Sequence, residues 1–300
     1  MSVHWFPRTR VGRVVAVVVT LAVMTAIVTL TAVLTYQHAA TPSLKPSNET
    51  PTIPSRSATP VLPGPSLAAD FTRLESTLHA KMGLVLSAVG DGQSVTTLGD
   101  WQEGPAWSTI KVPLAIAAYR QQEPPKLTEA MRAAITESDN AAAESLWAML
   151  GDPSTAAQRV QQILRETGDS TTVESRKLRP EFTAFGQTIW SLADQVRFTA
   201  SAFCNNENEP IFQLMNQVEP DQSWGIGGIP DTEFKGGWGP APSGNYLVRQ
   251  IGVLTSPTGK VAVAMATEPA SGQFADGTQE LGEVARWLTG HLGALPAGHC

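Results

Sequence analysis

The segment Pro105-Ala106-Trp107-Ser108-Thr109-Ile110-Lys111-Val112-Pro113-Leu114 places two reactive side chains at the start of an apolar helix. Ser108 and Lys111 are three residues apart, so on a helix they project from one face of its first turn. An amine whose pKa is lowered by burial can take the proton of a serine hydroxyl and make the serine nucleophilic. The positive end of the helix dipole would also stabilise an oxyanion at this point. The segment therefore predicts a nucleophilic Ser108 with Lys111 as its base.

An isolated Ser-x-x-Lys is common, and alone it fits a helix N-cap serine followed by a solvated lysine. Two further groups follow it in this chain. Ser138-Asp139-Asn140 begins another predicted helix, where the hydroxyl can relay a proton and the amide can hold a substrate carbonyl. Lys235-Gly236-Gly237 lies in a predicted strand, which brings a second cation beside Lys111 and leaves room for a substrate along the strand. Together the three groups predict one catalytic site.

Strand patterns at both ends of the region after residue 66 enclose a helical middle. The strongest helical patterns cover residues 67–82, 127–135, 141–150, 156–164, 185–203 and 274–292. The strand patterns cover residues 83–89, 94–98, 233–238, 246–254 and 260–267. One antiparallel sheet would gather both ends of the domain while the middle forms a helical lobe, which is an α+β fold with a cleft between the lobes.

In this order, the Ser-x-x-Lys, Ser-Asp-Asn and Lys-x-Gly groups resemble the signature of the class A β-lactamases and penicillin-binding serine peptidases. Their surroundings agree, because residues 105–114 look like the family's nucleophile helix and residues 134–143 look like its second motif. The resemblance covers about residues 66–293. It implies a β-lactamase/transpeptidase-like fold, with an antiparallel sheet flanked by helices and an all-helical lobe.

The resemblance also implies a role for each matching position. Ser108 would be the acylated nucleophile, Lys111 the general base of acylation and Ser138 the proton shuttle. Asn140 would bind a substrate amide, and Lys235 would neutralise charge beside the shuttle.

The remaining substrate contacts would come from the third motif and its neighbouring strand. The backbone amides of Ser108 and Trp238 would form the oxyanion hole, and Gly237 would let a substrate lie along the strand. Arg249, on the adjacent predicted strand, would hold a substrate carboxylate, with a solvated edge charge as the equal alternative.

Two departures from the family bear on the substrate. Gly236 stands where the family usually has a hydroxyl residue, so one hydrogen bond to a substrate carboxylate is lost, which can lower affinity about tenfold or more. Only 30 residues separate Ser108 from Ser138, about half the family's usual spacing. One wall of the cleft would therefore be trimmed, and a wider opening could suit a cell-wall peptide or another acyl compound.

A third departure concerns release of the acyl group. Class A enzymes activate water with a glutamate in a Glu-x-x-Leu-Asn setting, and the nearest candidate here is Glu174. Leu178 comes one residue late and Arg179 replaces the amide. Basic neighbours such as Arg176 could equally pair with Glu174 and keep it ionised at the surface.

These departures leave three functions open. With a working Glu174 the protein would be a β-lactamase that hydrolyses β-lactams. Without it, the protein would resemble a D,D-peptidase or transpeptidase that acts on acyl-D-Ala-D-Ala-like peptides and is trapped by penicillins. A non-catalytic cell-wall binding module is the third reading, which the intact motif residues disfavour.

The N-terminus predicts where the domain is located. Three arginines within residues 1–13 precede an uncharged apolar run at residues 14–36, long enough to span a ~30 Å hydrocarbon layer. This predicts a cytoplasmic basic end, a transmembrane signal-anchor, a Pro/Ser/Thr-rich linker at residues 37–66 and an extracytoplasmic domain at residues 67–300. Cleavage near Ala40 would instead release a secreted protein.

Composition narrows the partners. The net charge is -6 and the pI is about 5.4, with no basic stretch beyond the N-terminus, which argues against nucleic acid. The two cysteines, Cys204 and Cys300, allow one intrachain disulfide, but unpaired thiols fit the sequence equally well. No Cys or His cluster suggests a metal site, and the expected chemistry uses no cofactor.

Overall fold

The computed structural model describes residues 66–241 and 243–300. The basic end at residues 1–13, the signal-anchor at 14–36 and nearly all of the linker at 37–66 therefore lie outside the described residues. Within the described ranges, no helix has the length and apolar character needed to cross a bilayer.

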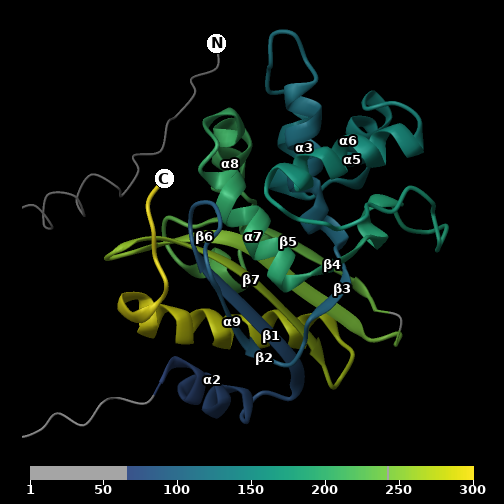
Figure 1. Ribbon diagram of the computed structural model, residues 1–300. Helices are drawn as coiled ribbons and strands as arrows, with labels where there is room; N and C mark the ends of the chain where they lie inside the picture. The colour runs from purple at the N-terminus through teal and green to yellow at the C-terminus, as the bar shows by residue number, and fades with distance from the viewer. Residues whose placement is uncertain (1–65, 242) are drawn as a thin grey trace, which may run out of the picture. The chain divides into compact units, whose positions relative to one another are not determined.

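A five-stranded antiparallel sheet with the strand order β2-β1-β7-β6-β5 forms the centre of the domain (Figure 1). Its strands are β1 (Ala80–Ala88), β2 (Val95–Gly99), β5 (Glu233–Pro240), β6 (Tyr246–Ser256) and β7 (Gly259–Pro269). β1 and β7 come from opposite ends of the domain and pair along their whole length. The sheet thus joins both ends of the domain, as predicted, and β5 with the third motif lies at its edge.

The two faces of the sheet are covered by different helices. α2 (Leu67–Glu75) and α9 (Phe274–His291) lie on one face, and α7 (Leu192–Phe203) covers the other (Figure 1). Because side chains alternate along a strand, Val263 of β7 enters the core beneath α9 while Ala264 enters the core shared with the helical lobe. This alternation gives the domain two separate hydrophobic clusters.

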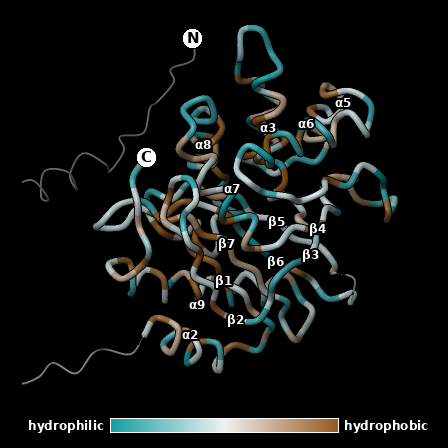
Figure 2. The backbone as a smooth tube through the Cα atoms, in the orientation of Figure 1, coloured by the Kyte–Doolittle hydropathy of each residue, from teal (hydrophilic) through white to brown (hydrophobic). Residues whose placement is uncertain are grey.

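The helical lobe contains the middle of the chain. It comprises α3 (Lys111–Arg120), α4 (Glu129–Arg132), α5 (Asn140–Met149), α6 (Pro153–Glu166) and α8 (Glu209–Met215). α3 is buried from Lys111 to Ala118, which fits a helix that is apolar nearly all round and lies in the core. Figure 2 shows hydrophobic residues along the central strands, whereas the loop after α3 is hydrophilic. A short ladder of β3 (Glu103–Pro105) and β4 (Ile189–Ser191) lies beside this lobe.

The α+β prediction is confirmed, and two expected helices are shorter than predicted. The helix expected at residues 67–82 ends at Glu75, because Ala80 already begins β1. Of residues 185–203, only Leu192–Phe203 are α-helical, and residues 185–187 form a 3₁₀ turn before β4. Pairing of β4 with β3 overrides the local helical periodicity at that point.

The two cysteines are paired. Cys204, directly after α7, forms a disulfide with Cys300, with 5.1 Å between the Cα atoms. Next to it the C-terminal segment joins the sheet, where Lys260 and Gly298 exchange backbone hydrogen bonds. The disulfide therefore fastens the chain end to the face of the sheet that carries α7.

Candidate active site

Ser108 lies in a short 3₁₀ turn, Trp107–Ile110, that leads directly into α3. The Thr109 hydroxyl donates to Ala106 O at 2.6 Å and accepts from Gln195 Nε2 at 2.8 Å, which ties the turn to α7. Trp107 has a φ of 49°, a left-handed conformation that costs a bulky residue of order 1–3 kcal/mol and persists only where packing enforces it. Here the Trp107 ring is buried against Phe182, so the surroundings fix the backbone next to the nucleophile.

Lys111 is the first residue of α3 and its side chain is 1% exposed. Its Nζ donates to Ser138 O and, at 2.8 Å, to Asn140 Oδ1. Burial lowers the pKa of Lys111 to about 7, although the nearby charge of Asp139 acts in the opposite direction. Near neutral pH a large share of this amine is therefore unprotonated, which is the state that a general base requires.

Ser138 lies between a π-helical turn, Ala133–Glu137, and α5, and its φ of 58° is left-handed. Asp139 caps α5, since its carboxylate accepts from Ala142 N at 2.6 Å. The backbone thus reverses at Ser138, and the residue meets two lysines, Lys111 at its carbonyl and Lys235 at its hydroxyl. π-helical turns inside helices often occur at functional sites, because they reposition a side chain.

Lys235 is fully buried in β5. Its Nζ donates to Ser138 Oγ at 2.8 Å and to Gly236 O at 3.0 Å. Burial, and then the charge of Lys111, hold the pKa of Lys235 well below its ordinary value. Because Ser138 Oγ accepts from Lys235, its own hydrogen remains available to donate elsewhere.

Gly237 brings β5 into contact with the nucleophile turn. A Cβ at this position would lie 2.9 Å from Ser108 N and 3.0 Å from Ala106 O, both closer than real side chains tolerate. Only glycine fits while β5 passes this close to Ser108. The next residue, Trp238, borders the cleft together with Ser108.

The cleft around Ser108 has a volume of about 400 Å³. Ser108, Asn140 and Trp238 line it, together with residues that the sequence did not single out: Trp107, Ala141, Glu144, Lys177, Glu181, Phe182, Thr183, Gly239, Pro240 and Tyr246. Glu144 follows Asn140 by four residues on α5, so the two side chains share one face of the helix. This spacing was the one signal in the sequence that Glu144 borders the cleft. Glu144 pairs with Lys177 at 2.9 Å across the cleft.

Solved structures of several β-lactamases are similar to this chain in fold. No protein-family model and no curated protein matches the sequence. A class A β-lactamase from Mycobacterium abscessus is 14% identical, over 76% of this chain and 99% of that one, with a TM-score of 0.59. The chromosome-encoded β-lactamase of Vibrio parahaemolyticus is 14% identical, over 75% and 98% of the two chains, with a TM-score of 0.58.

A β-lactamase from Sphaerobacter thermophilus gives a similar result, with 18% identity, 76% and 97% coverage and a TM-score of 0.56. The chain has the fold of the class A β-lactamases. At these identities the likeness concerns the fold, and any activity has to be argued from the site itself. Within this β-lactamase fold, the three motifs predicted from the sequence meet around one cleft.

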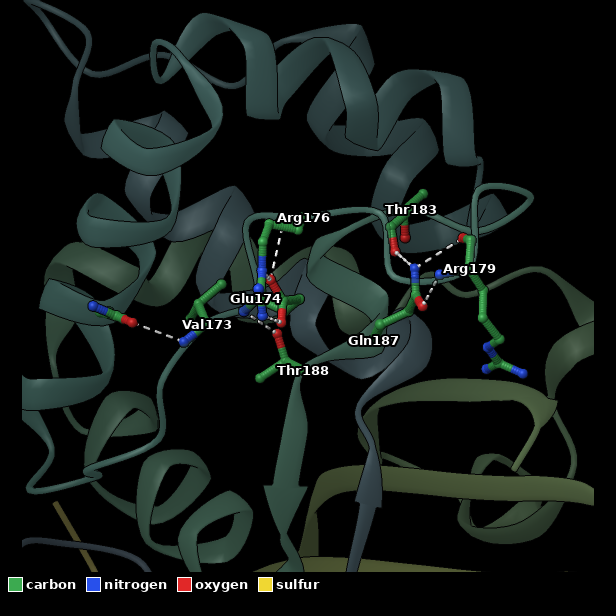
Figure 3. Close-up of polar contacts among 8 residues, drawn as sticks. Val173, Glu174, Arg176, Arg179, Thr183, Gln187 and Thr188 are labelled. Atoms are coloured by element: carbon green, nitrogen blue, oxygen red, sulfur yellow. Dashed lines mark hydrogen bonds and ion pairs between the residues drawn. The ribbon is translucent and has the colours of Figure 1, made fainter. Parts of the chain in front are cut away.

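Glu174 is on the loop that precedes β4, next to Arg176 and Thr188 (Figure 3), and is not among the residues that line the cleft. Its carboxylate accepts from Arg176 three times, from the backbone N at 2.8 Å, from Nε at 3.1 Å and from Nη2 at 3.2 Å. The hydrogen bond from the Arg176 side chain is the main cause that lowers the pKa of Glu174. The alternative in which a basic neighbour pairs with Glu174 is therefore the arrangement observed.

The prediction that Arg249 holds a substrate carboxylate is wrong, and so is the alternative of a solvated edge charge. Arg249 is 0% exposed, and burial lowers its pKa to about 9. Its guanidinium donates to Gly104 O and Pro105 O at 2.9 Å each, to Trp190 O at 3.0 Å, and to Gln195 Oε1. The strand alternation directs this side chain toward β3 and β4, where it joins the two strands to the main sheet.

No metal site emerges from the described residues, because they contain no group of three or more His, Cys, Asp or Glu side chains that could hold an ion. The side chains that meet near Ser108 are a hydroxyl, two amines and an amide.

Proposed function

We propose that this protein is a serine hydrolase that forms an acyl-enzyme at Ser108, with β-lactams as its substrate class. One observation carries the proposal: two buried lysines meet at the half-buried Ser138, Lys111 donating to its carbonyl and Lys235 to its hydroxyl, and Lys111 also donates to Asn140, which lines the cleft with Ser108. Such buried amines are costly to maintain and are typical of sites that need a base at neutral pH.

In the proposed acylation, the unprotonated Lys111 Nζ takes the proton of Ser108 Oγ. The oxygen attacks the substrate carbonyl carbon, and the backbone N–H groups of Ser108 and Trp238 hold the oxyanion. As the C–N bond breaks, the Ser138 hydroxyl donates its proton to the leaving nitrogen, and the proton on Lys111 restores it. Lys235 stabilises the negative charge that develops on Ser138 Oγ during this transfer, and Asn140 orients a substrate carbonyl.

A peptidase-like function is the second candidate, and the ion pair of Glu174 with Arg176 favours it. A glutamate that is held in this way is a weaker base toward water, so the acyl-enzyme would be released more slowly. Enzymes of that kind are labelled by penicillins and act on acyl-D-Ala-D-Ala-like peptides. A non-catalytic binding module explains neither the buried lysines nor the contact of Gly237 with Ser108.

We further propose that the domain acts outside the cytoplasmic membrane, tethered by residues 14–36 through the linker at residues 37–66. The cytoplasmic basic end would be residues 1–13 and the hydrolase domain residues 67–300. The Cys204–Cys300 disulfide supports this location, because disulfides persist in oxidising compartments.

The test is intact-mass analysis of the full chain in detergent after exposure to a penicillin, followed over time. We expect a covalent adduct that is absent in Ser108→Ala. Turnover of a chromogenic cephalosporin would identify a β-lactamase, and a lasting adduct without turnover would identify the peptidase-like alternative. An adduct that persists in Ser108→Ala would exclude this nucleophile, and no adduct with any β-lactam or acyl-D-Ala-D-Ala peptide would exclude the proposed chemistry.

A further inference from the structure

Four half-buried aromatic side chains, Trp224, Trp238, Tyr246 and Phe274, gather where β5 borders the cleft, and we refer to them as the β5 aromatic cluster. The Trp238 and Phe274 rings are 5.4 Å apart, and the Trp224 ring lies 6.1 Å from Trp238 and 6.0 Å from Phe274. Tyr246 completes the group at 6.1 Å from Phe274. Trp238 and Tyr246 line the cleft with Ser108, so a bound substrate can reach the cluster.

A buried glutamine fixes this cluster in place. Gln250 of β6 is fully buried, donates from Nε2 to Trp224 O at 2.7 Å and accepts from Ile226 N at 2.9 Å. Gln250 is also the residue that pairs with Gly236 across the two strands. The glutamine thereby anchors the Trp224 loop to the sheet beside Gly236.

Trp224 occupies the space that a side chain at position 236 would need. A Cβ on Gly236 would lie 2.9 Å from Trp224 Cζ2 and 3.1 Å from Cη2. A hydroxyl-bearing residue would therefore clash with the ring in this position, and glycine offers no side-chain donor to a carboxylate. The residue paired with Trp238 is Val248, which is buried and apolar.

The cations near the cleft are already engaged. Lys235 donates to Ser138 Oγ and to a backbone carbonyl, and Arg249 donates to backbone carbonyls of β3 and β4. Arg179 donates to Pro240 O at 2.9 Å, and its guanidinium lies over the Trp107 and Phe182 rings. Among the described residues that line the cleft, the single cation is Lys177, which pairs with Glu144. Glu181 adds a second acidic side chain to the lining. A substrate carboxylate would thus meet aromatic rings and acidic groups in place of a free cation.

We propose that the β5 aromatic cluster selects substrates that carry an uncharged aromatic or apolar group beside the scissile bond. This inference rests on the proposed acyl-enzyme and names the substrate class within it. Aromatic side chains bind flat apolar groups through their large surface and ring edges, whereas a carboxylate loses hydration there without gaining a partner. Trp238 is the specificity-determining side chain, and Trp224 positions it and excludes a hydroxyl residue.

The test compares two compounds that share one β-lactam ring and differ in the group beside it. Benzylpenicillin carries a carboxylate there, and its benzyl ester carries an uncharged aromatic group. Binding of both to the full-length Ser108→Ala protein is measured by calorimetry in detergent, so that acylation is not required. Acylation of the wild-type chain is followed by intact mass. Each acylation rate is divided by the rate at which hydroxide hydrolyses the same compound, because the two rings differ in intrinsic reactivity. We expect the ester to be preferred by about tenfold or more in both measurements.

Three variants test whether the preference for the ester comes from the β5 aromatic cluster. Trp238→Ala should lower the ester-to-acid ratio at least about fivefold while its backbone N–H remains. The double variant Trp224→Ala with Gly236→Thr makes room for a hydroxyl and should shift the ratio toward the free acid. Trp287→Ala removes an equally half-buried indole, packed on Phe71 and outside the cleft lining, and should leave the ratio unchanged.

The outcomes separate the inference from the function on which it rests. If Ser108→Ala binds the acid as tightly as the ester, or if Trp238→Ala and Trp287→Ala change the ratio equally, the inference is overturned. If the ester is preferred in binding through Trp238 but neither compound acylates the wild-type chain, the ligand preference of the cluster stands and penicillins are excluded as acyl donors.

Discussion

The cleft around Ser108 and the loop that carries Glu174 differ in how far along the chain the partners of their charged side chains lie. At Ser108, the two lysines are buried and each meets acceptors that come from distant parts of the chain. On the loop, Glu174 pairs with Arg176, only two residues away, and the Arg176 side chain is 76% exposed. Contacts between distant segments thus hold the lysines near Ser108, the proposed nucleophile, whereas a local ion pair holds Glu174, the residue predicted to release the acyl group.

The same direction of pKa shift has opposite consequences in the two regions. Lowering the pKa of Lys111 makes an amine that can accept a proton at neutral pH. Lowering the pKa of Glu174 makes a carboxylate that is less able to accept one. Burial therefore activates the lysine, and the arginine deactivates the glutamate. Four experiments test this contrast.

The largest effect is expected for Lys111→Met. Loss of the general base should slow acylation by a fluorescent penicillin about 10²–10⁴-fold, measured as a second-order rate constant. Lys126→Met, which removes an exposed lysine from the loop after α3, is the matched control and should react at the wild-type rate. Equal rates for both variants would mean that Lys111 is not the base.

A smaller loss, about 10²-fold in the same acylation rate, is expected for Lys235→Met. Since Lys235 donates to Ser138 Oγ, it should act mostly through that hydroxyl. Ser138→Ala should therefore cost a similar factor, and the double variant should lose little more than either single one. Fully additive losses would show that the two residues act independently.

The pH dependence of acylation should follow Lys111. With its pKa at about 7, the rate should rise about tenfold per pH unit below pH 6 and level off above pH 7, because only the unprotonated amine accepts the proton. Asp139→Asn should move the profile to lower pH, since the Asp139 charge raises the pKa of Lys111. A profile that is unmoved, or moved upward, would contradict this electrostatic assignment.

The smallest effect is expected for Glu174→Gln. Because Arg176 holds the carboxylate outside the cleft lining, the half-life of the acyl-enzyme should change by less than about twofold. The half-life is measured by intact mass after excess penicillin is removed, with the exposed Glu181→Gln as a comparison inside the cleft. A tenfold longer half-life in Glu174→Gln alone would identify Glu174 as the water-activating base after all.

The sequence predicted which motifs come together near Ser108, because the residues of each motif are close together in the chain. Ser108 and Lys111 share one helical turn, Ser138 and Asn140 share one helix start, and Gly237 follows Lys235 by two residues. Each motif carries its own local geometry, so their order along the chain was sufficient to predict that they meet.

The substrate side was predicted poorly, because its geometry depends on pairings between distant segments. Arg249 was expected at the cleft, but its place in the alternation of β6 directs it toward β3 and β4. The position of Trp224 over Gly236 depends on Gln250, 26 residues later in the chain. No short stretch of the sequence indicates where either side chain lies.

Hydrophobic periodicity and short motifs are local properties, so the sequence was sufficient for the α+β fold class and for the prediction of Ser108 as nucleophile with its motif partners. The surroundings of these side chains depend on the folded structure. It buried Lys111 and Lys235 until their pKa values fell, joined Cys204 to Cys300, and placed an aromatic cluster beside the nucleophile. Burial and the register of paired strands arise from contacts between distant residues, which no local pattern records.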